Sequence, residues 1–230
     1  MWSTWIFSLW RNEMDLLQGR FVVFDLDGVL VDSQAVVERH WRRWARRHDL
    51  DPEHVLAVAH GRRTVDAIRT LAPALDAARE VERMVASSGH DTDGLEAIRG
   101  APALVKAVPD GRWGIATSGT RTTAENRLRH TGFPIPDVFI TAEDVRAGKP
   151  DPEVYRRAAD ALGMAPAHGI VIEDTPAGLQ AAHAAGMHAV AVSTTYERTE
   201  FTTADAVVDG PWALRLEPRG TAIVLSLDER

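Results

Sequence analysis

The sequence lacks cysteine altogether, and that absence removes several kinds of chemistry. Without thiols the chain has no disulfide, no thiol nucleophile and no cysteine-based zinc or iron–sulfur site. It also lacks an apolar run of the ~20 residues that a membrane helix requires. Positive charge is not in excess, because 26 Lys and Arg stand against 33 Asp and Glu, for a formal net charge of −7. We therefore expect no nucleic-acid partner, no membrane partner and a cytoplasmic location.

The composition is that of a folded globular chain. Its 230 residues are 45% hydrophobic and 26% charged, which are ordinary values for globular proteins and exclude wholesale disorder, collagen and coiled coils. At about 100–200 residues per domain, this length predicts one large domain or a core with a smaller module. No internal repeat or low-complexity linker divides the chain.

Short apolar runs alternate with helical patterns along most of the sequence. The runs typical of buried strands are Phe21–Phe24, Trp113–Ala116, Val138–Ile140, Ile170–Ile172 and His188–Val192, with a weaker one at Ala206–Val208. The helical patterns are Thr122–Thr131, Glu153–Leu162 and Ala177–Ala185, and each is followed by a glycine that can cap it. This alternation predicts an α/β fold with a Rossmann-like, doubly wound parallel sheet.

One long stretch contains helical patterns but no convincing strand. It runs from about residue 33 to residue 100 and separates the first predicted strand from the second. We therefore predict a core formed by residues 20–32 and 101–213, interrupted by a helical insertion over 33–100. Residues 1–19 form an N-terminal extension, and residues 214–230 form a C-terminal extension with a possible hairpin around Pro218–Gly220.

Two features of these regions have a plain structural interpretation and a functional alternative. Arginines at helical spacing from Arg39 to Arg47 are expected to form a solvated face, with a nucleic-acid surface as the alternative. The run Met1–Trp10 is too short to span a membrane and lacks the basic region and cleavage site of a signal peptide. We expect a packed or disordered extension there, with anchoring by its three tryptophans as the alternative.

Acidic residues follow two of the predicted strands. Asp25 and Asp27 come directly after the first strand, and Glu173 and Asp174 end the run that begins at Gly169. Ligands of open α/β sheets bind at the carboxyl ends of the strands. If the two strands are adjacent, these carboxylates repel one another unless a cation lies between them, and hard oxygen ligands favour Mg²⁺.

Two other segments carry groups that suit phosphate. Thr117, Ser118 and Gly119 follow a predicted strand with hydroxyl and backbone N–H donors, and they precede a helix. Lys149 lies in a turn before Pro150 and can act as a point-charge partner for phosphate. Taken singly, each could be a turn or surface residue, but their order and setting favour a common phosphate site.

In this order, Asp25-x-Asp27-Gly28, Thr117-Ser118, Lys149-Pro150 and Glu173-Asp174 resemble the four motifs of the haloacid dehalogenase-like hydrolase superfamily. The resemblance covers roughly Arg20 to Gly210, and the helical insertion resembles the helical cap of that family. The segments His60–Arg69 and Thr141–Pro150 look closest to the sugar-phosphate and polyol-phosphate phosphatases, which include the 2-deoxyglucose-6-phosphate and glycerol-phosphate enzymes.

The resemblance implies a role for each motif residue. Asp25 would be the nucleophile that forms an aspartyl-phosphate, and Asp27 the general acid and base. Thr117, Ser118, Gly119 and Lys149 would hold the phosphoryl oxygens. The implied Mg²⁺ ligands are the carboxylates of Asp25 and Asp174 and the backbone carbonyl of Asp27, with Glu173 binding directly or through water.

The resemblance also separates activities within the family. Haloalkanoate dehalogenases lack the second aspartate of the first motif, so Asp27 favours phosphate chemistry. The β-phosphoglucomutases carry a cap histidine where this chain has Val37, with His40 nearby, so a phosphomutase stays the alternative, followed by a non-catalytic phosphate-binding module. Arg62 and Arg63 of the cap are expected to contact the substrate, or else to be exposed. We expect a small phosphorylated metabolite as substrate and a monomer or weak dimer.

Overall fold

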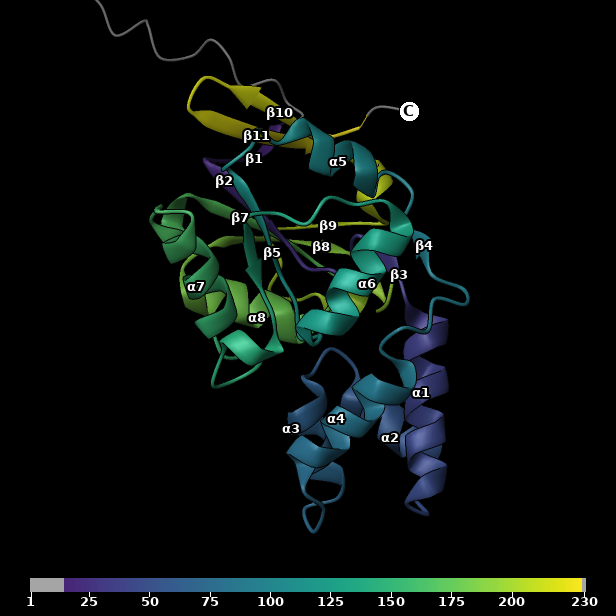
Figure 1. The fold of residues 1–230 in the computed structure, drawn as a ribbon. Coiled ribbons are helices and arrows are strands. Elements are labelled where there is room, and N and C mark those ends of the chain that lie inside the picture. Colours follow the sequence, from purple (N-terminus) through teal and green to yellow (C-terminus); the bar gives the residue numbers. More distant parts are fainter. Residues whose placement is uncertain (1–14, 229–230) are drawn as a thin grey trace, which may run out of the picture.

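A six-stranded sheet forms the centre of the computed structural model, which describes residues 15–228 (Figure 1). The strand order is β6-β5-β2-β7-β8-β9, and every neighbouring pair is parallel. The strands are β2 (Phe21–Phe24), β5 (Trp113–Ala116), β6 (Val138–Ile140), β7 (Gly169–Glu173), β8 (His188–Val192) and β9 (Ala206–Val208). This topology confirms the predicted Rossmann-like α/β fold.

Alternate residues of the central strand β2 face opposite layers of helices. Val22 and Phe24 belong to one hydrophobic cluster with the apolar residues of α5 (Ala101–Ala107) and α6 (Arg121–Thr131). Phe21 and Val23 belong to the other cluster, with α7 (Glu153–Ala161) and α8 (Pro176–Ala185). A strand covered on both faces must be apolar at every position, which explains the continuous run of buried residues in β2.

The insertion after β2 folds into four helices that lie beside the carboxyl edge of the sheet (Figure 1). They are α1 (Gln34–Arg47), α2 (Pro52–Ala59), α3 (Thr64–Leu71) and α4 (Ala77–Ser88). Their separate core includes Trp41, Trp44, Val55 and Ile68. The antiparallel pair β3 (Val31–Asp32) and β4 (Glu96–Ala97) connects this cap to the sheet domain. Arg43, Arg46 and Arg47 of α1 are exposed to solvent.

A second, antiparallel sheet lies at the opposite end of the molecule. Its strands are β1 (Asp15–Gly19), β10 (Leu214–Arg219) and β11 (Ala222–Leu227), in the order β1-β11-β10. Sequence analysis placed β1 inside an N-terminal extension, and residues 1–14 of that extension lie outside the described residues. The short helices η1 (Ala142–Asp144), η2 (Pro166–His168), η3 (Arg198–Glu200) and η4 (Pro211–Ala213) complete the elements. Within residues 15–228, no helix is long and apolar enough to cross a membrane.

Candidate active site

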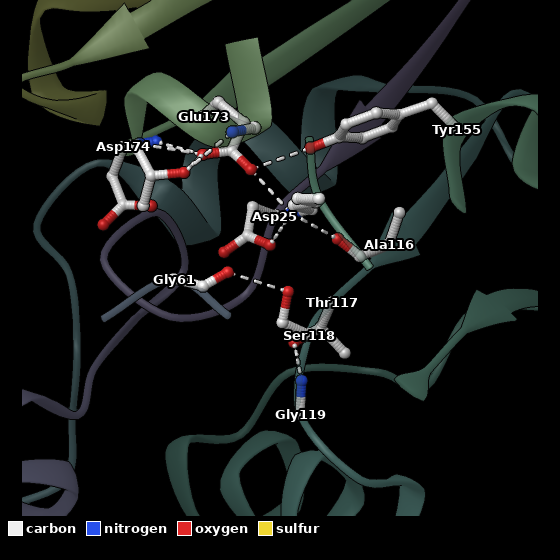
Figure 2. A network of polar contacts seen from close by, with 12 residues as sticks. Asp25, Gly61, Ala116, Thr117, Ser118, Gly119, Tyr155, Glu173 and Asp174 are labelled. Atoms are coloured by element: carbon white, nitrogen blue, oxygen red, sulfur yellow. Dashed lines mark hydrogen bonds and ion pairs between the residues drawn. The ribbon is translucent and has the colours of Figure 1, made fainter. Parts of the chain in front are cut away.

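Three adjacent strands bring the motif residues to one place. In the order β5-β2-β7, Thr117 follows β5, Asp25 follows β2 and Glu173 ends β7. Because parallel strands end at the same edge of a sheet, residues far apart in sequence meet there. Figure 2 shows Asp25 between Glu173 and the turn that begins at Thr117, and the Lys149 ammonium group contacts both carboxylates.

Lys149 lies at the middle of this group. Its Nζ is 2.5 Å from Asp25 Oδ1 and 2.6 Å from Glu173 Oε1, and it also donates to the carbonyl oxygen of Ala116 at 3.2 Å. Its side chain is only 2% exposed. Burial lowers the pKa of a lysine, but the charges of Asp25 and Glu173 outweigh burial and raise the pKa of Lys149 well above its ordinary value. The ammonium group is therefore held in its charged form.

Glu173 has both carboxylate oxygens engaged. Oε1 accepts hydrogen bonds from Lys149 and from the Tyr155 hydroxyl at 2.9 Å. Oε2 accepts from the backbone N–H groups of Asp174 and Thr175 and from the Thr175 hydroxyl. Burial raises the pKa of Glu173, but Lys149 and these donors bring it below its ordinary value. Sequence analysis expected Glu173 to bind Mg²⁺ directly or through water, which stays a prediction; in the structure its two oxygens anchor Lys149 and the turn after β7.

Asp174 differs from its neighbour because one of its oxygens is unpaired. Among residues 15–228 its buried Oδ1 has no hydrogen-bond partner, and burial and the charge of Glu173 raise the pKa of Asp174 well above its ordinary value. Burial also raises the pKa of Asp25 to about 7, with Lys149 opposing that rise and Glu173 adding to it. Two buried carboxyl groups that are short of positive charge fit a bound cation.

The described residues contain no group of three or more His, Asp or Glu side chains arranged as a metal site. Mg²⁺ is commonly bound in proteins through one or two carboxylates, with the other positions taken by water and substrate phosphate, so the Asp25 and Asp174 carboxylates are the groups here that fit such an ion.

The turn after β5 contributes hydroxyl groups. Thr117 is buried, and its Oγ1 accepts a hydrogen bond from the backbone N–H of Gly119 at 3.0 Å. The Ser118 hydroxyl donates to the carbonyl oxygen of Gly61 in the cap, also at 3.0 Å (Figure 2). The turn therefore lies next to Asp25 and contacts the cap directly.

The side chain of Asp27 is held by a hydrogen bond and an ion pair, from two residues that sequence analysis did not single out. Ser33 Oγ donates to Asp27 Oδ1 at 2.6 Å, and Arg127 Nη1 lies 2.5 Å from the same oxygen. Ser33 follows β3 and precedes α1, whereas Arg127 lies on the buried face of α6. In the sequence, Arg127 is recognisable only as a basic residue at a helix position between the apolar Ala124 and Leu128. That signal does not identify Asp27 as its partner.

A cavity of about 640 Å³ opens between the cap and the carboxyl edge of the sheet. The core contributes Asp25, Asp27, Thr117, Lys149 and Asp174 to its wall. The cap contributes polar side chains that include Gln34, Glu38, His60 and Arg62. A molecule of metabolite size could contact both sets of residues at once.

The two cap arginines take different positions. Arg62 lines the cavity, but Arg63 is buried elsewhere, at the start of α3. Arg63 pairs with Asp66 at 2.6 Å and donates to the carbonyl oxygens of Val145 and Arg146 at 2.8 and 2.9 Å. It therefore joins the cap to the loop that carries Lys149, and it does not reach the cavity that sequence analysis expected it to line.

A parallel sheet with a carboxylate beside a buried lysine at its carboxyl edge, and a helical cap over that edge, makes this chain a capped α/β protein with a candidate active site under the cap. Residues 22–192 match the family described as haloacid dehalogenase-like hydrolase. The chain is 39% identical over 212 residues to hexitol phosphatase A of Escherichia coli K12, and the match covers 88% of this chain and 97% of that protein.

Two further relatives agree with this match. Glycerol-1-phosphate phosphohydrolase 2 of Saccharomyces cerevisiae is 36% identical over 188 residues, which cover 76% of this chain and 75% of that protein. The crystal structure of a hydrolase from Pseudomonas syringae superposes with a TM-score of 0.74 at 25% identity, over 83% of this chain and 94% of that one. The chain therefore belongs to the haloacid dehalogenase-like hydrolase family, and it is a phosphatase of that family.

Proposed function

We propose that this phosphatase hydrolyses a small sugar phosphate or polyol phosphate through a phosphorylated Asp25, with Mg²⁺ as cofactor. The observation that carries the proposal is the position of Asp25. Its Oδ1 is paired with Lys149, and its side chain lines the cavity beside Thr117 and Asp174. A carboxylate held in this way can attack phosphorus while positive charge lies beside the phosphoryl oxygens.

The chain's own residues divide the work between them. Lys149 and the Thr117–Gly119 turn orient the phosphoryl group, since phosphoryl transfer depends mainly on positioning and on stabilising charge. Asp27 gives a proton to the leaving alcohol and then takes one from the water that hydrolyses the phosphorylated aspartate. The cap excludes other water from the cavity while the intermediate exists.

Asp25 and Asp174, with the backbone carbonyl of Asp27, would hold the Mg²⁺. The support for this assignment is the unpaired, buried Oδ1 of Asp174 together with the raised pKa of both aspartates. When bound, the ion supplies positive charge that offsets the carboxylates and the phosphoryl oxygens.

The polar cap wall supports a substrate rich in hydroxyl groups. Gln34, His60 and Arg62 offer hydrogen-bond donors, and Glu38 accepts hydrogen bonds and disfavours a second anionic group nearby. The names of the relatives, a hexitol phosphatase and a glycerol-1-phosphate phosphohydrolase, point to the same class of substrate. A cytoplasmic location and a monomeric or weakly dimeric state stay predictions.

Release of inorganic phosphate from a panel of hexitol, glycerol and sugar phosphates tests the proposal. We expect turnover that EDTA abolishes and Mg²⁺ restores, and no turnover by Asp25→Asn. Asp137→Asn, at an exposed position away from the cavity, is the matched control and should keep full activity. Metal-independent hydrolysis would contradict the cofactor, and an active Asp25→Asn would contradict the nucleophile. Conversion of a sugar 1-phosphate to its 6-phosphate without phosphate release would indicate a mutase instead.

A further inference from the structure

Within residues 15–228, the contacts that fix the side chain of Asp27 all involve one of its two oxygens. Ser33 Oγ and Arg127 Nη1 both contact Oδ1, at 2.6 and 2.5 Å. The Ser33 contact is a hydrogen bond and the Arg127 contact is an ion pair. Because the hydrogen bond and the ion pair both involve Oδ1, they define the orientation of the carboxyl group and leave its other oxygen, Oδ2, outside these two contacts.

Arg127 has no other charged partner in the described part of the chain. Its side chain is 8% exposed, and Asp27 is its one ion-pair partner among residues 15–228. The next arginine on α6, Arg129, is 64% exposed and pairs with Glu125 at the surface. A buried guanidinium is costly unless it is paired, so the position of Arg127 and that of Asp27 depend on each other.

The other oxygen of Asp27, Oδ2, lies near the turn after β5, which belongs to the proposed phosphoryl site. The position that a Cβ atom would occupy on Gly119 marks where the side chains of Asp27 and Thr117 approach each other. That position is 4.0 Å from Asp27 Oδ2 and 3.3 Å from Thr117 Oγ1. Oδ2 is therefore on the side of the turn that follows β5, and Asp27, Thr117 and Arg127 all line the same cavity.

We propose that Arg127 is a positioning residue, which holds Asp27 so that Oδ2 carries out the proton transfers of the reaction. This inference rests on the proposed function. As the bond from Asp25 to phosphorus forms and the bond to the leaving oxygen breaks, the proton on Oδ2 moves to that oxygen. In the second half-reaction Oδ2 takes a proton from the attacking water, which restores the starting state.

The dependence of kcat/KM on the leaving group tests this role. An alkyl phosphate such as glycerol 1-phosphate needs a proton on its leaving oxygen, whereas 2,4-dinitrophenolate leaves readily without one. Since kcat/KM covers the steps up to departure of the leaving group, it reports the acid function of Asp27 alone. We expect Arg127→Met to lower kcat/KM about 100-fold for glycerol 1-phosphate and only a fewfold for 2,4-dinitrophenyl phosphate.

Three further variants make the test specific to Asp27. Arg129→Met is the matched control on the same helix and should leave both substrates unaffected. In an Asp27→Asn background, Arg127→Met should add no further loss on glycerol 1-phosphate, because its target is already gone. Ser33→Ala should change the ratio of the two substrates in the same direction by a smaller factor. It also keeps the test available if Arg127→Met does not fold.

Equal losses on the two substrates, or additive losses in the double variant, would show that Arg127 supports the fold in general and would overturn the inference. An unchanged ratio in Ser33→Ala would overturn the anchoring of Asp27 through Oδ1. These results differ from a failure of the proposed function, in which the wild-type protein itself would release no phosphate from any ester.

Discussion

Replacing Lys149 with methionine should destabilise the protein strongly, whatever its substrate. The substitution keeps the length of the side chain and removes its charge. In the wild type, the ammonium group contacts Asp25 and Glu173, whose side chains are 9% and 1% exposed. The variant leaves both carboxyl groups buried without the cation that pairs with them.

The expected size of the effect follows from that burial. Removing one partner of a buried ion pair costs about 3–5 kcal/mol. Total stabilities of native proteins are only about 5–15 kcal/mol, so the loss is a large fraction of the whole. For a chain of this size each 1 kcal/mol lowers the melting temperature by about 2–4 °C. Lys149→Met should therefore melt roughly 6–20 °C below the wild type.

Urea and thermal unfolding followed by circular dichroism measure this loss. Lys106→Met is the matched control, because Lys106 is exposed on α5 and should change the free energy of unfolding by less than about 0.5 kcal/mol. Adding Glu173→Gln to Lys149→Met should recover part of the stability, because one of the two unpaired carboxylates is then gone. If the Lys149→Met and Lys106→Met variants had the same free energy of unfolding and the same melting temperature, the stabilising role of the buried Lys149 ion pairs would be refuted.

Three other changes test separate parts of the structure. In Gly178→Ala the new Cβ would lie 1.7 Å from Glu173 Oε1, so we expect a loss of about 1–3 kcal/mol in thermal unfolding, and an unchanged melting temperature would contradict this packing. Arg63→Met should speed amide hydrogen exchange in residues 145–149, while Arg69→Met at the cap surface should not. Burial opposes ionisation of Asp91, but its arginine and histidine partners on α1 hold its pKa at about 2. Asp91→Asn should therefore cost about 1 kcal/mol at pH 7, allowing for solvent screening. Because the stabilisation is lost as the pH falls through the folded-state pKa, the difference in urea unfolding should shrink between pH 5 and pH 2.5.

The predicted strands and motifs agree with the structure where the sequence signal is local. Fully buried parallel strands require continuous apolar runs, so β2 and β7 stand out in the sequence. The carboxyl ends of such strands meet in any sheet of this type, which is why Asp25, Thr117 and Glu173 could be grouped before the structure was known. β1 was missed because its partner β11 lies about 200 residues away and its own run is short.

The roles of individual charges depended on contacts between distant segments, which no spacing reveals. Glu173 and Asp174 are adjacent in sequence, yet one is saturated by donors and the other has an unpaired oxygen. Arg62 and Arg63 are also adjacent, yet one faces the cavity and the other holds the cap to the core. In each pair the backbone sends consecutive side chains to different environments, so the sequence alone could not assign them.

The charges at the site support the proposal that the protein uses a divalent cation. Lys149 is shared by Asp25 and Glu173, and Arg127 is paired with Asp27, so Asp174 has no ion-pair partner within the described part of the chain. A substrate phosphate adds about −1.5 to −2 charges to this site. We therefore expect inorganic phosphate to raise the melting temperature clearly in the presence of Mg²⁺ and by much less in EDTA. Asp174→Asn removes one negative charge and the unpaired oxygen, so it should weaken the Mg²⁺-dependent part of the shift. Equal stabilisation by phosphate with and without Mg²⁺ would mean that Lys149 and Arg127 suffice for the anion.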